Sequence, residues 1–340
     1  MEVTFCVPTF NRKELLSRAI ESILGLPFEK KIIISDNASF DSTHDYCKNL
    51  VKDYDFITYY RQEENIGFVE NTLFVIEKCI TDKIVILADD DYLLKSSFSE
   101  FYDYSKHLKS EIVCAKANRI DNFGTLKNTL PVRNYMNKYY NDYESSYFIM
   151  SDILMWTSSI FSTDALKESI ISLKLKSKES TFRLAIDVAI LYYFSKKYGI
   201  HYFNKAVMVF FDHENQTSKP KSEDLFIQFN LSRISCFNII NNPTSIYFKS
   251  IYLVNLILKA RLINYKNAEK IFSHELDIKS LLPFYYLKLK FIQNVPIFFL
   301  RLYLKMQFLM IWSNLKYQSC NSKLQRLIKK NTKKNDTIFV

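Results

Sequence analysis

Three adjacent carboxylates follow an apolar segment that is typical of a buried strand. Residues 84–87 are Ile, Val, Ile and Leu, and after Ala88 come Asp89, Asp90 and Asp91. Such a strand suits the middle of a parallel sheet, where ligands bind beyond the carboxyl ends of the strands. Neighbouring carboxylates repel one another unless a cation or hydrogen bonds separate them. The stretch therefore predicts either a divalent-cation site that also contacts phosphate, or a solvated acidic turn.

Polar side chains also follow the other apolar segments of the first ninety residues. Thr9 and Asn11 follow the first segment, Asp36 and Asn37 follow the second, and Asn65 comes after the third. The carboxyl ends of parallel strands meet at one edge of a sheet. We therefore expect these side chains to gather there with the three acids.

The apolar spacing predicts the elements that position these residues. Strands are expected at 3–7, 31–35, 57–60, 84–87, 111–115, 155–161 and 201–211, and helices at 13–24, about 43–54, 68–79, 97–108 and 182–197. Strands that alternate with helices predict an α/β fold with a mostly parallel sheet and right-handed crossovers. Residues 118–144, rich in tyrosine and asparagine and with little periodicity, predict a mobile loop over the site.

The length of 340 residues fits two domains. We place their boundary near 218–223, where a Lys-Pro-Lys-Ser run breaks the pattern, so that 1–218 form the α/β domain and 219–340 a smaller helical region. The net charge of +10 belongs to this second region. It has twelve Lys or Arg and no acid between 279 and 334, which leaves −2 for the rest of the chain.

Residues 281–315 mix aromatic side chains with lysines. This composition predicts attachment to an anionic membrane surface, with an ordinary helical core or a dimer interface as the alternative. Nucleic-acid binding is not expected, because no recognised binding motif accompanies the charge.

The cysteines favour a reducing compartment. The six are scattered without a CxxC pair and several fall in apolar segments, so we expect buried, reduced thiols and a cytoplasmic location. The sequence opens without a recognisable signal peptide, and no run reaches the roughly 18 uncharged apolar residues of a membrane-spanning helix.

Four motifs together resemble the family 2 glycosyltransferases of the GT-A fold. They are Val7-Pro8-Thr9-Phe10-Asn11-Arg12, the ten residues 34–43 (Ile-Ser-Asp-Asn-Ala-Ser-Phe-Asp-Ser-Thr), Asn65-Ile66-Gly67 and Asp89-Asp90-Asp91. They occur in the family's order and spacing over about ninety residues. The likeness fades after residue 115 and ends near 218. It implies a transferase that binds a nucleotide-diphosphate sugar together with Mn²⁺ or Mg²⁺.

The resemblance also implies contacts with the donor. They fall on Pro8, Thr9, Asn11, Arg12, Asp36, Asn37, Asn65, Gly67 and Asp89. Asp36 would accept an N–H from the base, and because a carboxylate only accepts, this favours uracil or thymine. The alternatives are that Asp36 closes a local turn and that Asn65 and Gly67 form a tight turn before a helix.

The acidic motif departs from the usual Asp-x-Asp-Asp of the family. With Tyr92 and Leu93 in register, the first acid is replaced by Ala88. The resemblance then puts the metal-ligand position on Asp90 and the ribose contact on Asp89, while Asp91 assists either. His213 resembles a histidine that closes on the metal in some members, with simple hydrogen bonding as the alternative.

Asp187 occupies the position where the family often carries its general base. It lies among apolar neighbours in the predicted helix 182–197, where an aspartate is either aimed into a cavity or used for capping or an ion pair. A base opposite the leaving group predicts transfer with inversion.

The implied substrate is a growing bacterial surface glycan, such as O-antigen or capsule. The acceptor would be carried on a lipid diphosphate at the inner face of the cytoplasmic membrane, and a homo-oligomer is possible. One alternative is a nucleotidyltransferase, although the loop after the first strand offers only Arg12 to grip phosphate. Another is a membrane-associated nucleotide-sugar-binding protein with a degenerate site.

Overall fold

The computed structural model describes residues 1–132, 135–142, 144–145, 155–213 and 222–240, together with positions 249, 252 and 256. Met1–Tyr252 form one compact unit. The second unit, Leu253–Val340, lies almost wholly outside the described residues. The predicted membrane-binding segment 281–315 and the basic residues between 279 and 334 fall in that undescribed part.

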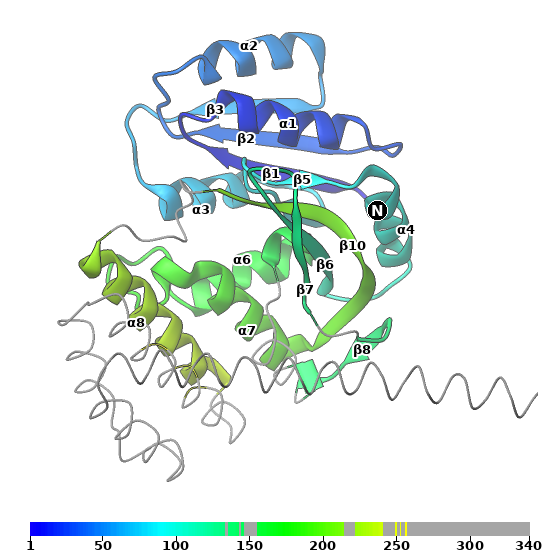
Figure 1. Ribbon diagram of the computed structural model, residues 1–340, viewed down its shortest axis with the longest axis vertical. Helices are drawn as coiled ribbons and strands as arrows, with labels where there is room; N and C mark the ends of the chain where they lie inside the picture. The colour runs from blue at the N-terminus through cyan, green and yellow to red at the C-terminus, as the bar shows by residue number, and fades with distance from the viewer. Residues whose placement is uncertain are drawn as a thin grey trace, which may run out of the picture. The chain divides into compact units, whose positions relative to one another are not determined.

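Ten strands of the described residues form one mixed sheet (Figure 1). They are β1 (Val3–Thr9), β2 (Lys31–Asp36), β3 (Ile57–Arg61), β4 (Lys83–Ile86), β5 (Tyr92–Leu93), β6 (Ile112–Asp121), β7 (Leu126–Leu130), β8 (Lys138–Tyr140), β9 (Ser159–Ser162) and β10 (Ile200–Asp212). Their order is β3-β2-β1-β4-β9-β6-β10-β5, with β7 beside β6 and β8 beside β10. β1 to β4 run parallel, β9 runs antiparallel between β4 and β6, and β10 is parallel to β6. The predicted, mostly parallel α/β sheet is confirmed.

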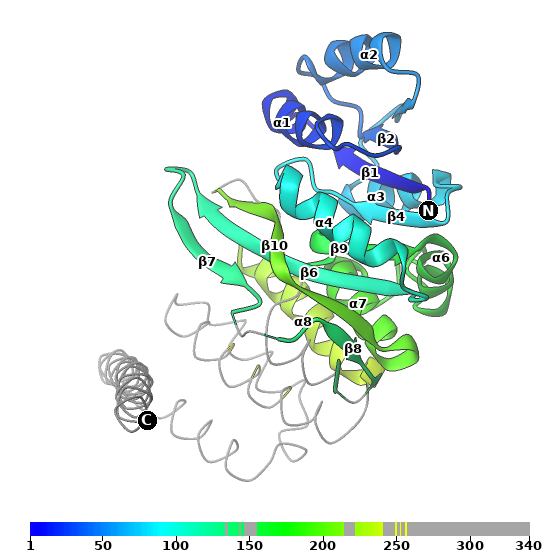
Figure 2. The ribbon, with the colours of Figure 1, turned by 90° about the vertical axis from the view of Figure 1, so that its right-hand side faces the viewer.

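Helices cover both faces of this sheet (Figure 2). They are α1 (Lys13–Leu24), α2 (Thr43–Asp53), α3 (Phe68–Lys78), α4 (Lys95–Lys106), α6 (Thr163–Ser172), α7 (Ile186–Tyr198) and α8 (Glu223–Ile240), with the short 3₁₀ turns η1 (Trp156–Ser158) and η2 (Arg183–Ala185). On one face, α1 and α4 bury Leu16 and Phe98; on the other, α3 and α7 bury Leu73 and Phe194. The apolar spacing in the sequence reflects this burial on both faces.

Residues 118–144 differ from the predicted loop. β6 continues to Asp121, turns at Gly124, and returns as β7, while β8 pairs with β10. The Asp121 carboxylate fixes the turn because it accepts hydrogen bonds from the backbone N–H groups of Phe123 and Thr125. Most side chains of β7 remain at least partly exposed. A projecting hairpin of this kind needs no regular apolar alternation, so its sequence lacked the strand signal.

Two predicted elements are shifted in the structure. The segment predicted as a strand at 155–161 begins as η1 and becomes β9 only at Ser159. The helix predicted from residue 182 begins as η2, and α7 follows from Ile186. As a result, Asp187 lies in the first turn of α7 rather than in the middle of a helix. The positive end of the helix dipole favours a negative charge at that position.

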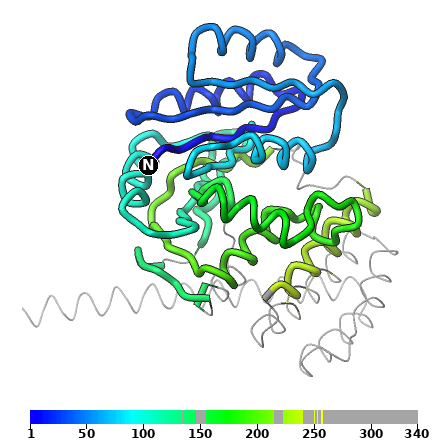
Figure 3. Tube along the Cα trace, turned by 180° about the vertical axis from the view of Figure 1, so that it is seen from behind, coloured from blue at the N-terminus to red at the C-terminus, as the bar shows by residue number. Residues whose placement is uncertain are grey.

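α8 packs against α7 and η2 inside the first compact unit (Figure 3). The Ser232 hydroxyl accepts a hydrogen bond from the Ala185 N–H at 3.1 Å, and the rings of Tyr192 and Phe237 are 5.8 Å apart. The unit extends to Tyr252, past the 218–223 region where the sequence pattern breaks.

Five of the six cysteines confirm the expectation of buried thiols. They are free and buried: Cys6, Cys47, Cys79, Cys114 and Cys236. Cys320 lies outside the described residues. Among the helices that the structure describes, none combines the length and the apolar content needed to span a bilayer.

Candidate active site

A cavity of about 640 Å³ opens at the carboxyl ends of β1, β2 and β4. One wall comes from the first ninety residues and contains the loops after these strands. The other wall comes from η1, η2, the start of α7 and α8. The polar and charged lining residues are Thr9, Arg12, Asn37, Asn65, Glu70, Asn71, Asp89, Asp90, Asp91, Thr157, Arg183, Asp187 and Arg233. The volume is in the range of a small-molecule site.

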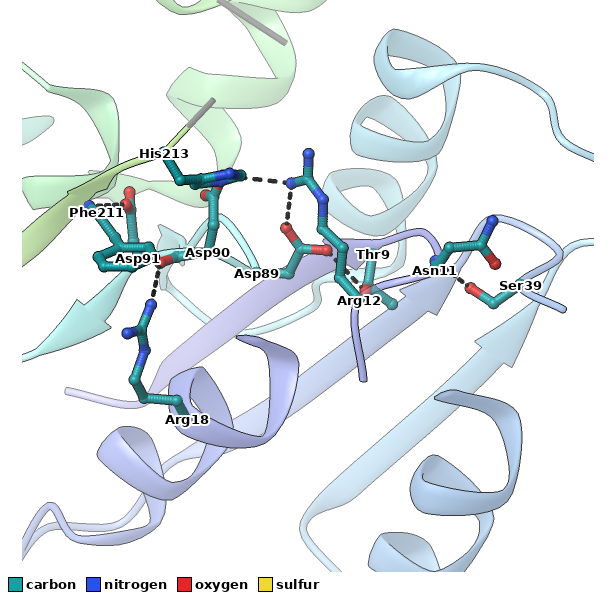
Figure 4. A network of polar contacts seen from close by, with 10 residues as sticks. All are labelled: Thr9, Asn11, Arg12, Arg18, Ser39, Asp89, Asp90, Asp91, Phe211 and His213. Carbon is teal, nitrogen blue, oxygen red and sulfur yellow. Dashed lines mark hydrogen bonds and ion pairs between the residues drawn. The ribbon is translucent and has the colours of Figure 1, made fainter. Parts of the chain in front are cut away.

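Arg12 joins two of the three acids on the first wall (Figure 4). Its Nη1 lies 2.9 Å from Asp89 Oδ1 and 3.3 Å from Asp90 Oδ2. The Thr9 hydroxyl donates to the other Asp89 oxygen at 2.8 Å. Asp89 is therefore held by the last residue of β1 and by Arg12 just after the strand, both in the motif that carried the resemblance.

Asp90 and Asp91 connect this wall to the end of β10. His213 Nε2 lies 2.9 Å from Asp90 Oδ2, so the structure brings together two residues 123 positions apart. The carboxylate of Asp91 accepts the backbone N–H of Phe211 at 3.1 Å. The side chain of Asp91 is thus engaged with the strand, whereas Asp90 is the acid beside the histidine.

Burial of the acids changes their titration. Asp89 and Asp91 are only 4% and 1% exposed. Burial, followed by the opposing effects of the Arg12 and Asp90 charges, raises the pKa of Asp89 to about 6. Burial and the Asp90 charge also raise the pKa of Asp91 well above its usual value. Burial lowers the pKa of Arg12, but the charges of the acids outweigh this and raise it. The single positive charge of Arg12 therefore does not fully offset the negative charge of the three clustered carboxylates.

Asn37, Asn65 and Gly67 form a second group on the same wall. The Asn37 amide donates to Asn65 Oδ1 at 2.9 Å, and Asn37 Oδ1 accepts the N–H of Ile66. Gly67 precedes α3 with φ of 90°, a conformation that strains residues with a Cβ. The glycine allows the chain to enter α3 directly beneath the cavity.

The second wall carries Asp187 and two arginines. Arg183 pairs with Glu70 and also donates to the carbonyl of Leu175. Within the described residues, Asp187 has neither a hydrogen bond nor an ion pair, and it lines the cavity. Its carboxylate is therefore accessible to a ligand.

Comparison with known proteins shows which family the residues of the first wall resemble. A family model described as glycosyl transferase family 2 matches residues 4–168. Residues 4–168 are a glycosyl transferase family 2 domain. The second wall lies only partly in this family 2 domain, because Asp187 and α8 follow it in the sequence.

Two relatives match part of this chain. The abequosyltransferase RfbV of Salmonella typhimurium is 35% identical over 108 residues, which are 31% of this chain and 32% of that protein. The GalNAc(5)-diNAcBac-PP-undecaprenol beta-1,3-glucosyltransferase of Campylobacter jejuni is 37% identical over 100 residues, which are 29% of this chain and 32% of that protein. Each match thus spans about a third of the relative.

A solved structure shares the fold over a longer range. S. aureus TarS 1-349, in complex with UDP-GlcNAc, matches with a TM-score of 0.62 and 14% identity. The match covers 86% of this chain and 87% of that chain. At this identity the likeness shows the fold alone, which is the GT-A fold expected from the motifs.

Two predicted donor residues of the family 2 domain do not line the cavity. Asp36 is fully buried, and its oxygens accept hydrogen bonds from the Ser39 N–H and the Tyr59 hydroxyl, both at 2.8 Å. Asn11 lies in the left-handed region with φ of 52°, and its side chain accepts the Phe40 N–H. Both side chains accept backbone N–H groups of the 36–40 loop and hold it in place. Their role in this structure is to position the loop beside the cavity.

Asp90 and His213 are the candidate ligands for a divalent cation. The part of the chain that the structure describes contains no preformed group of three or more His, Cys, Asp or Glu ligands. Mn²⁺ and Mg²⁺ often use only one or two protein carboxylates, with substrate phosphate and water as the other ligands. The Asp90 carboxylate and the neighbouring His213 imidazole fit this requirement, while Asp91 is occupied by the Phe211 N–H.

Several residues in or next to the cavity had no signal in the sequence. Arg18 donates to the Asp90 carbonyl at 2.9 Å, and its guanidinium carbon lies 4.7 and 4.2 Å from the ring centroids of Tyr92 and Phe211. It therefore fixes the backbone of the acidic turn. Arg233 and Phe229 come from α8, in a segment without family motifs. Tertiary packing alone brings these residues to the site.

Proposed function

We propose that this protein transfers a sugar from a nucleotide-diphosphate sugar to an acceptor hydroxyl, with inversion at the anomeric carbon. The main support is a single cavity that has the acidic motif on one wall and, on the other, the Asp187 carboxylate, which has no partner among the described residues. The family 2 match supports the reaction class. The two walls would hold donor and acceptor on opposite sides of the reacting carbon.

The donor would bind along the first wall. Asn37, Asn65 and Gly67 would contact the nucleoside, and Pro8, Thr9 and Arg12 lie between it and the acids. A UDP-sugar is favoured because the Asp36 carboxylate can accept an imide N–H. Each Asp36 oxygen has one bond from the chain and a second lone pair. Because Asp36 is fully buried and outside the cavity lining, the base could reach it only if the chain around Asp36 moved.

Asp90 and His213 would hold a Mn²⁺ or Mg²⁺ ion, with Asp91 behind them and Asp89 towards the ribose. When bound, such an ion stabilises the negative charge of the departing nucleoside diphosphate. Arg12 would contribute a second positive charge at the same place, because its guanidinium already lies between Asp89 and Asp90.

Asp187 would act as the general base. Its carboxylate would accept the proton of the acceptor hydroxyl as the oxygen attacks the face opposite the leaving group. Asp187 lies in the first turn of α7 and lines the cavity, where an acceptor hydroxyl could reach it.

The acceptor is proposed to be a lipid-linked glycan of a bacterial surface polysaccharide. This proposal comes from the likeness to the two relatives, one of which is named for transfer to an undecaprenol-linked substrate. It implies a peripheral position on the inner face of the cytoplasmic membrane, with the basic C-terminal region as the anchor. Flotation with anionic vesicles tests the anchor, because a variant without residues 281–340 should stay unbound. A truncated protein that still floats would rule it out.

Thermal unfolding with nucleotide sugars tests the reaction class. The full-length protein is heated with each sugar of a panel, with and without Mn²⁺, and the released nucleotide is analysed. We expect UDP-sugars with Mn²⁺ to raise the unfolding midpoint, because a ligand that binds only the folded state stabilises it. Slow hydrolysis should release UDP. Release of pyrophosphate from UTP would instead indicate nucleotidyl transfer, and the absence of any shift would contradict the proposal.

A further inference from the structure

Three arginines line the cavity, and two of them have carboxylate partners. Arg12 pairs with Asp89 and Asp90, and Arg183 pairs with Glu70. Arg233, on α8, forms no ion pair within the described residues. Within the described residues its neighbour is the Tyr252 hydroxyl, and no carboxylate offsets its charge, so that charge can serve an anionic ligand.

Arg233 is held in position by its surroundings. Its guanidinium carbon lies 4.8 Å from the centroid of the Phe229 ring, one turn earlier on α8. Its Nε is buried and has no hydrogen-bond partner. The adjacent Ser232 is bonded to Ala185, directly before α7. A guanidinium fixed in this way loses little freedom when it binds an anion.

Arg233 and Asp187 line the same cavity, from α8 and from the first turn of α7. Burial raises the pKa of the Cys236 thiol, the Asp187 charge raises it further, and the Arg233 charge lowers it. Both charges are thus close to Cys236, yet Asp187 and Arg233 form no ion pair with each other. A ligand between them could present a hydroxyl to Asp187 and an anionic group to Arg233.

Exposed apolar side chains also line the cavity. Phe68, Leu184 and Leu225 all line it, and they are 47%, 41% and 51% exposed. They come from α3, η2 and α8, so three separate elements contribute to one apolar rim. A cation inside such a rim suits a phosphate ester that carries an apolar chain.

We propose that Arg233 binds a phosphate group of the acceptor, next to the hydroxyl that Asp187 deprotonates. Arg233 would then determine specificity by selecting phosphate-bearing acceptors over neutral ones. A guanidinium forms two parallel hydrogen bonds with a phosphate, which a neutral acceptor cannot replace. This inference rests on the proposed function, because it takes the second wall as the acceptor side.

Calorimetric titration of the full-length protein tests the role of Arg233. The probes are geranyl phosphate, geraniol and inorganic phosphate, added in the presence of saturating UDP and Mn²⁺ so that the donor wall is filled. We expect Arg233→Gln to weaken geranyl phosphate binding by about tenfold or more, because it removes a charge-assisted contact. Geraniol should bind the wild type and the variant equally.

Two further variants separate charge from folding. Arg233→Lys keeps the positive charge but loses the bidentate geometry and the stacking on Phe229, so its affinity for geranyl phosphate should fall between those of Arg233→Gln and the wild type. Gln228→Ala changes an exposed position of α8 outside the cavity and should leave every affinity unchanged. The affinity for UDP, measured separately, should be the same in all variants.

The probes also distinguish the source of the phosphate. If inorganic phosphate binds as tightly as geranyl phosphate, and its affinity depends equally on Arg233, the site recognises the phosphate group alone. Weaker binding of inorganic phosphate would indicate that the apolar rim recognises a lipid-borne phosphate. Wild-type affinity for geranyl phosphate in Arg233→Gln would overturn the inference, as would equal affinities of the wild type for geranyl phosphate and geraniol. Failure of the wild type to bind UDP would count against the proposed function instead.

Discussion

Acidic side chains occupy two opposite settings in this protein. Glu168, on α6, is partly exposed and accepts hydrogen bonds from Lys197 and from the hydroxyls of Tyr193 and Tyr198. The bonds from Lys197, Tyr198 and Tyr193, in that order, lower the pKa of Glu168 to about 2. In the cavity, burial raises the pKa of Asp89 to about 6, although Arg12 and Thr9 both contact it. Hydrogen-bond donors stabilise the charge of the surface acid. The buried cavity acids have too little positive charge around them, and a bound cation can provide it.

Asp187 is the strongest test of this contrast, because it is the cavity acid without a partner in the described residues. If its role is to accept a proton, Asp187→Asn should lower the transfer rate by about 10²- to 10⁴-fold while UDP affinity is retained. Transfer rates and calorimetric UDP titrations measure the two effects. The unfolding midpoint should not fall, since no ion pair is lost.

The stereochemistry of the product provides an independent check of Asp187. A simple base predicts inversion, which nuclear magnetic resonance of the freshly formed glycoside can detect. A product of retained configuration, or an Asp187→Asn variant with wild-type rates, would exclude Asp187 as the general base. The contrast between the surface acid and the cavity acids would then have no catalytic consequence at Asp187.

Asp90→Asn tests whether the cavity acids require a cation. At a ligand concentration one hundred times the dissociation constant, binding stabilises a folded protein by about 2.7 kcal/mol. We expect UDP with Mn²⁺ to stabilise the wild type on this scale and the variant to lose the part that depends on Mn²⁺. Thermal unfolding with and without the metal separates the two parts.

Asp103→Asn is the matched control for Asp90→Asn. Asp103 is an exposed acid of α4 that pairs with Lys106, far from the cavity lining. Its loss should leave the response to Mn²⁺ unchanged. If Asp90→Asn retains full metal-dependent turnover of the donor, the acidic motif is not the cation site.

The sequence predicted the first wall well because its information is local. Each of the strands β1, β2 and β4 is a short apolar run, and the polar residues follow it within a few positions. The topology of a parallel sheet then places these residues at one edge. The match at 4–168 and the cavity lining by Thr9, Arg12 and the three acids agree with that reasoning.

The second wall could not be predicted in the same way. Arg233 reaches the cavity because α8 packs on α7 and η2, a contact between segments that no motif connects. Tyr59 occupies one oxygen of Asp36 from a neighbouring strand, so spacing along the chain did not reveal that Asp36 is enclosed. The periodicity of apolar side chains indicates which face of a helix or strand is buried. It does not indicate which residues of other elements pack against that face.

Glu168→Gln is the smallest change and the sharpest test of the opposite setting. A carboxylate with a lowered pKa adds stability above its unfolded pKa, near 4.5, and this stability is lost as the pH falls towards about 2. The wild type should therefore unfold at a slightly higher temperature than Glu168→Gln near neutral pH, because exposed ion pairs contribute little. The difference should shrink as the solution is acidified below about pH 4.5. Unfolding midpoints measured over this range decide the point. A difference that grows on acidification would mean that Glu168 is strained like the cavity acids, and the contrast between the two settings would fail.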